Sequence, residues 1–138
     1  METRVLGQKL ENLRNCSLRL QSKYPISAEI LATDFDLQDI ISVNLERAVQ
    51  SCIDIASHIA SDFDDVSGMS AASLFNELAK KKVISQSNAD LMVKAVGFRN
   101  LLVHRYATIE WKRVFDNLAK DMNLLRDFAG EITNYCNI

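Results

Sequence analysis

The sequence predicts an all-α protein, an up-and-down helical bundle of four long helices and one short helix. Its 138 residues include only 4 glycines and 1 proline, so the residues that interrupt helices are scarce. Hydrophobic residues make up 48% of the chain, and over several long segments they recur every three or four positions, which is the helical period. A chain of this length suits a single domain, residues 1–138, that buries about 70% of its unfolded surface.

The first two long helices are expected over about 2–23 and 37–62. Tyr24 and Pro25 end the first, because a residue that precedes proline avoids the α region, and a connector follows over about 25–36. The first helix has one apolar stripe, made of Leu6, Leu10, Leu13, Cys16 and Leu20. The second helix is apolar on more than one face, which predicts a central position or an oligomer interface.

A polar loop over about 61–69 leads to the short helix, which Ser70 or Ser73 caps. Lys80–Lys82 close that helix. Lysines at a helix C-terminus complement the macrodipole, and a patch that contacts phosphate is the alternative interpretation. Residues 85–88 offer another N-cap, so the third long helix begins near Ser85 and runs into the stretch 97–106.

Thr108 is expected to cap the fourth long helix. The apolar stripe of this helix consists of Trp111, Phe115, Leu118, Met122, Leu125, Ala129, Ile132 and Cys136.

Charge and cysteine content limit the class of protein. The net charge of −2 provides no chain-wide basic field for nucleic acid, so any such contact must be local. Cys16, Cys52 and Cys136 are odd in number and widely spaced, which favours buried thiols in a reducing compartment. No apolar run approaches the roughly 20 residues that span a bilayer, and no signal pattern begins the chain. We therefore expect a cytoplasmic protein without membrane contact.

The stretch Gly97–Tyr106 carries the most distinctive chemistry. Its apolar residues suit a core helix, but Arg99, Asn100 and His104 have no packing use beside them. Arginine provides a fixed cationic fork for phosphate, and histidine exchanges a proton near neutral pH. This combination predicts phosphodiester cleavage without a metal or cofactor, with His104 moving the proton, Arg99 stabilising charge on the phosphoryl oxygens and Asn100 in support. A ribose 2′-hydroxyl is the natural nucleophile.

Helix geometry separates the two principal residues. Arg99 and His104 are five apart, so they lie about 140° apart around an ideal helix. Asn100 and His104 share one face, and so do Arg99 and Tyr106 if the helix continues that far. Either the helix ends or distorts near His104, or the same motif from a second copy completes the site, and we favour a two-fold dimer.

A second polar pair, Asp54 and His58, lies four residues apart in the apolar second helix. It could orient the histidine or supply half of a metal site, but an ordinary contact between successive turns is the preferred interpretation. We therefore expect no metal site.

The motif Arg99-x4-His104-x-Tyr106 resembles the R-x4-6-H signature of HEPN-domain ribonucleases, and its trailing tyrosine resembles the HepT-like toxin branch. The stretch Asn44–Ile59, the acidic loop after it and Trp111 are similar to that branch as well.

This resemblance implies a helical-bundle homodimer with its active cleft at the interface, acting as a metal-independent endoribonuclease toxin of a type II or type VII-like toxin–antitoxin pair. It further implies an RNA substrate, Arg99 and His104 as catalytic residues, and a minimal nucleotidyltransferase antitoxin that transfers AMP to Tyr106. A modified Tyr106 would place charge and bulk beside the cleft. The alternative is a non-catalytic helical subunit that binds nucleotide or substrate for a two-component nucleotidyltransferase.

Overall fold

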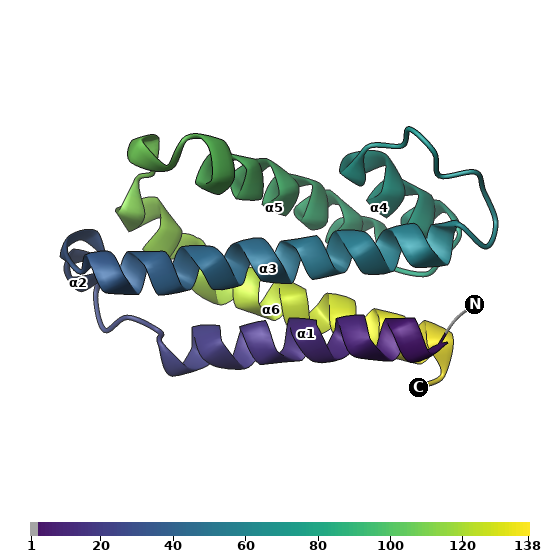
Figure 1. Cartoon of the computed structure of the whole chain (residues 1–138), viewed down its shortest axis with the longest axis horizontal. Coiled ribbons are helices and arrows are strands. Elements are labelled where there is room, and N and C mark those ends of the chain that lie inside the picture. The colour runs from purple at the N-terminus through teal and green to yellow at the C-terminus, as the bar shows by residue number, and fades with distance from the viewer. Residues whose placement is uncertain (1–2) are drawn as a thin grey trace.

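The computed structural model describes residues 3–138 and shows an up-and-down bundle of α-helices (Figure 1), which confirms the predicted fold class. The long helices are α1 (Thr3–Ser22), α3 (Phe35–Ala60), α5 (Gln86–His104) and α6 (Trp111–Cys136), and the short ones are α2 (Ala28–Thr33) and α4 (Ala71–Lys80). A 3₁₀ turn, η1 (Tyr106–Thr108), connects α5 to α6.

The connector at 25–36 contains α2, a second short helix that the sequence pattern did not predict. Its first turn is capped by Ser27, whose hydroxyl accepts a hydrogen bond from the backbone N–H of Ile30 at 3.2 Å. Asp34 ends α2 and also caps α3 through the N–H of Leu37 at 3.0 Å. Six residues are too few to show a helical period, so only these caps could have indicated the helix.

Two predicted caps are confirmed and one is wrong. The hydroxyl of Ser70 accepts from the N–H of Ser73 at 3.1 Å to start α4, and that of Ser85 accepts from the N–H of Asn88 at 3.1 Å to start α5. Thr108 does not cap α6, because it lies in η1 and its hydroxyl donates to the carbonyl of Arg105 at 2.8 Å. The residue before α6 is Glu110, which makes no side-chain cap bond to the described chain.

Helix α3 occupies the centre, which is one of the two positions that its apolar character predicted. It contacts α1, α2, α4, α5 and α6, and Figure 1 shows it between α5 on one side and α1 on the other. The core holds fully buried residues of every long helix, among them Leu13, Ile55, Met92 and Phe128. Packing around α3 therefore fixes how α1 and α5 sit relative to each other.

Helix α5 has apolar side chains on its buried face and also on a face that the rest of the bundle leaves exposed. Ala89, Met92 and Leu102 are buried inside. Leu91 and Leu101 are 46% and 44% exposed, so an apolar strip faces outward along the same helix that carries the motif. Among residues 3–138, none of the helices has the length and apolar character that crossing a membrane requires.

Candidate active site at the end of helix α5

The helical backbone of α5 ends at His104, two residues before Tyr106. Arg105 leaves the helix at φ −136° and ψ 43°, while its N–H still donates to the carbonyl of Leu101 at 2.8 Å. Arg99 and His104 thus remain on one helix and point to different sides of it. Within residues 3–138, no hydrogen bond or ion pair joins their side chains. The alignment of Arg99 with Tyr106 does not occur, because the helix stops first.

Arg99 is a half-buried side chain that other residues hold in place. Its Nη2 donates to Oε1 of Gln50 at 2.7 Å, and its Nη1 donates to Oδ1 of Asn100 at 3.2 Å. Its Nε is buried and has no hydrogen-bond partner in the described part of the chain. Asn100, which the sequence placed on the His104 face, is thus a neighbour of the arginine. The exposed His104 imidazole stands at the helix terminus, where an incoming group can reach it.

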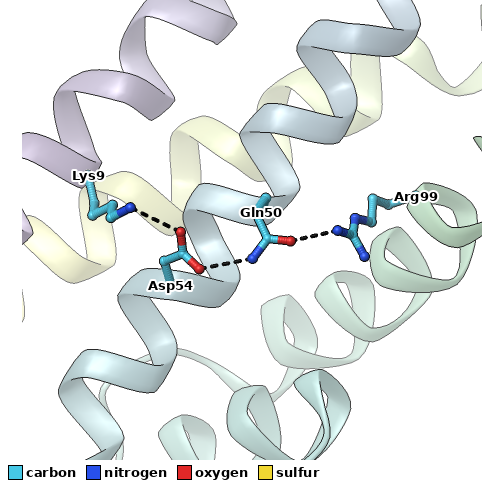
Figure 2. A network of polar contacts seen from close by, with 4 residues as sticks. All are labelled: Lys9, Gln50, Asp54 and Arg99. Atoms are coloured by element: carbon cyan, nitrogen blue, oxygen red, sulfur yellow. Dashed lines mark hydrogen bonds and ion pairs between the residues drawn. The ribbon is translucent and has the colours of Figure 1, made fainter. Parts of the chain in front are cut away.

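A chain of polar contacts continues from Arg99 across the bundle (Figure 2). The amide Nε2 of Gln50 donates to Oδ1 of Asp54 at 2.9 Å, and Nζ of Lys9 binds Oδ2 of the same carboxylate at 3.1 Å. The chain links α1, α3 and α5 through four side chains. Asp54 therefore has partners other than the expected His58, because its two carboxylate oxygens are turned to Gln50 and Lys9.

Tyr106 lies in η1, where Asp39 of α3 and Trp111 of α6 hold it. Its hydroxyl donates to Oδ1 of Asp39 at 2.8 Å, and its ring meets the Trp111 ring in a T-shaped contact with the centroids 5.7 Å apart. The side chain is 38% exposed. Burial, and then the hydrogen bond to the Asp39 carboxylate, raise the pKa of Tyr106. The hydroxyl is therefore protonated at neutral pH and lies near the surface.

A groove of about 910 Å³ runs beside the motif between α5 and α6, with α3 at its base. Arg99 and Leu101 line it from α5, and Arg113 and Asp121 line it from α6. Burial raises the pKa of Asp121 to about 6. The groove is mainly apolar, with cationic and anionic side chains among its lining residues.

Two other predicted features lie outside this site. Lys80–Lys82 end α4 and precede α5, so the length of a 19-residue helix separates them from His104. Nζ of Lys81 sits 5.5 Å from the ring centroid of Phe63. Lys80 lies in the last turn of α4, and the interpretation that these lysines complement the helix dipole stays a prediction. In the part of the chain that the structure describes, no three His, Cys, Asp or Glu side chains converge as metal ligands do.

Gln50 and Asp39 are site residues that the sequence alone did not reveal. Gln50 precedes Asp54 by four positions in a largely apolar helix, a spacing that allows an amide–carboxylate contact, and this signal was available. Asp39 is 67 residues from Tyr106, and nothing in the local sequence indicates their contact.

Comparison with known proteins agrees with this fold and motif. The ribonuclease HepT-like family profile matches residues 11–132. The mRNA nuclease HepT of Shewanella oneidensis is 34% identical over 102 residues, which cover 74% of this chain and 76% of that protein. The tRNA nuclease HepT of Aphanizomenon flos-aquae is 26% identical over 137 residues, covering 98% of this chain and 88% of that one.

Solved structures show the same arrangement of helices. The tri-AMPylated HEPN toxin of Shewanella oneidensis, solved in complex with an MNT antitoxin, superposes with a TM-score of 0.84 at 29% identity and covers 94% of this chain and 97% of that one. A helical bundle that superposes on this HEPN toxin over nearly its whole length is a protein of the HEPN class. Within that class, the chain belongs to the ribonuclease HepT-like family.

Proposed function

We propose that this chain is a metal-independent endoribonuclease toxin that cleaves RNA in a cleft between two copies of itself. The observation that carries the proposal is the last part of α5, where a held guanidinium at Arg99 lines an open groove and an exposed imidazole at His104 ends the same helix. Membership of the HepT-like family supports it, because two curated relatives are named as an mRNA nuclease and a tRNA nuclease.

The reaction this site suits is attack by a ribose 2′-oxygen on the adjacent phosphorus. The new bond from the 2′-oxygen to phosphorus forms as the bond to the 5′-oxygen breaks, leaving a 2′,3′-cyclic phosphate and a 5′-hydroxyl. One imidazole takes the proton of the 2′-hydroxyl, and one imidazolium gives a proton to the departing 5′-oxygen. Arg99 stabilises the charge that develops on the phosphoryl oxygens.

A second copy of the chain would supply the second imidazole that this reaction needs. The two proton transfers call for two imidazoles, and each chain carries one His104. The outward apolar strip of α5, which includes Leu91 and Leu101, gives a two-fold interface a surface to cover. Pairing around α5 would bring two copies of Arg99 and His104 to one cleft.

Tyr106 is the proposed point of control. A related toxin is tri-AMPylated in complex with an MNT antitoxin, and we propose that such a nucleotidyltransferase is the partner here and modifies Tyr106. The phenolic oxygen would attack the α-phosphorus of ATP and release pyrophosphate. Because Tyr106 is two residues from His104, the added phosphodiester would bring negative charge and bulk to the cleft.

The test is cleavage of RNA in EDTA by the purified chain, compared with Arg99→Ala and His104→Ala. We expect the wild type to cleave and both variants to lose cleavage while remaining dimeric. Retained cleavage in either variant contradicts the assignment. No cleavage by dimeric, unmodified wild type would instead favour a non-catalytic subunit that binds nucleotide or substrate for its partner.

A further inference from the structure

The two hydrogen bonds that the Arg99 guanidinium donates differ in length and in the helix that provides the acceptor. Arginine offers five N–H donors in a planar fork, and a fork that stabilises a phosphoryl group must be held at a fixed angle. Its contact with Asn100, at 3.2 Å, comes from the next residue of the same helix. The contact with Gln50, at 2.7 Å, is the shorter one and comes from α3, 49 residues away. Gln50 is therefore the contact that ties the guanidinium to the body of the bundle.

The neighbours of Gln50 leave its amide only one useful orientation. On one side stands a guanidinium, which only donates, and on the other stands the Asp54 carboxylate, which only accepts. Oε1 must face Arg99 and Nε2 must face Asp54, as the two distances of 2.7 and 2.9 Å show. A flipped amide would lose both hydrogen bonds.

Charge explains why an amide suits this position. A glutamate would bind Arg99 as an ion pair and cancel the positive charge that a phosphate needs, whereas a glutamine accepts the hydrogen bond and leaves the charge in place. The carboxylate that Gln50 contacts, Asp54, is paired with Lys9 at 3.1 Å. Lys9 and Asp54 together are neutral, so the network of four side chains keeps one net positive charge, at Arg99.

We propose that Gln50 is a positioning residue that holds the Arg99 guanidinium at its working angle, with Asp54 and Lys9 fixing Gln50 in turn (Figure 2). The inference rests on the proposed function, because it takes Arg99 as the group that acts on phosphate. It assigns a role in the reaction to α1 and α3, which carry none of the motif.

The first experiment compares Gln50→Leu with a matched control on the same protein. Gln86 forms the same contact with a carboxylate four residues later, to Asp90 at 2.9 Å, but at an exposed site at the far end of α5. We expect Gln50→Leu to lower kcat by about 10- to 100-fold and to change KM for RNA by less than about threefold, since misplacement of a group acting in the transition state affects kcat first. Gln86→Leu should match the wild type.

The second experiment uses Gln50→Glu and pH. Several groups surround position 50: Lys9, Cys16 and Arg19 from α1, Arg47 and Asp54 from α3, and Arg99 from α5. Glu46 stands one helical turn before position 50 on α3. In its ionised form, the introduced carboxylate would bind Arg99 and face Asp54 with like charge. In its protonated form, the introduced carboxyl would reproduce glutamine, because its carbonyl accepts from Arg99 and its hydroxyl donates to Asp54. We expect the rate of this variant relative to wild type to rise by about tenfold as the pH falls from about 7 to about 5.

A third measurement follows Arg99 itself by NMR. Loss of the Gln50 amide should increase the mobility of the Arg99 guanidinium in Gln50→Leu, whereas Gln86→Leu should leave that mobility unchanged. This readout does not depend on cleavage, so it tests the positioning role even if the chain is not a nuclease.

The outcomes separate this inference from the function on which it rests. If Arg99→Ala retains cleavage, the proposed function fails. If Arg99→Ala is inactive but Gln50→Leu keeps the wild-type kcat and a rigid Arg99, the positioning role is overturned. If Gln50→Leu does not fold, Gln50→Glu decides, and a rate that follows the wild type at every pH overturns the proposal.

Discussion

Asp121 should make the stability of this protein fall as the pH rises through the acidic range. The carboxyl lies on α6 within the groove beside α5, and burial raises its pKa from 3.8 to about 6. A proton is thus held more tightly in the folded chain than in the unfolded chain. Between these two pKa values the folded state binds more protons, so the free energy of unfolding decreases with rising pH.

The size of the effect follows from the change in pKa. A pKa that is higher by about 2, at about 1.4 kcal/mol for each tenfold change in proton affinity, gives about 3 kcal/mol, reached once the pH is above about 6. Asp121→Asn removes the titrating group and keeps the shape. The variant should be more stable than the wild type by up to about 3 kcal/mol at neutral pH, with the advantage vanishing below about pH 4.

Urea unfolding over a series of pH values measures this difference directly. Protein concentration must be fixed, because dimerisation contributes to apparent stability. Asp127→Asn is the control, since Asp127 also lines the groove but is exposed. An advantage for Asp121→Asn that is constant with pH, or that grows toward acid, would refute the reasoning.

Three further predictions concern modification, assembly and the core. Asp39→Asn should lower the pKa of Tyr106, because the Asp39 carboxylate opposes formation of the tyrosinate. Ultraviolet titration of the tyrosines measures this pKa, and an unchanged value contradicts the prediction. Leu101→Glu should weaken the proposed dimer and its RNA cleavage while the helical content stays constant. Analytical ultracentrifugation measures the dimer, and a dimer that survives the substitution contradicts the proposed interface. Phe128→Ala should cost about 3–5 kcal/mol, since the ring is fully buried and packs edge-on against Phe75 at 5.8 Å; a loss below about 1 kcal/mol in thermal or urea unfolding would contradict the packing.

The helices were predictable because their signals are local and repeated. The stripe from Leu6 to Leu20 is buried as expected, and the serines at 70 and 85 cap α4 and α5 as serine does in short peptides. Helix α2 was not predicted, because its six residues are too few to show a helical period. The prediction that Thr108 caps α6 was wrong, because its hydroxyl donates to the carbonyl of Arg105 instead. Sequence spacing does not exclude that alternative partner.

The sequence by itself determined the all-α bundle and the residues of the motif, because helical period, caps and residue chemistry are properties of short segments. Only the tertiary structure decided which side chains those residues meet. Arg99 is held by Gln50 and Tyr106 by Asp39, across 49 and 67 residues of chain. Such contacts depend on how α3 packs against its neighbours, and packing is set by the whole core rather than by any one stretch of sequence.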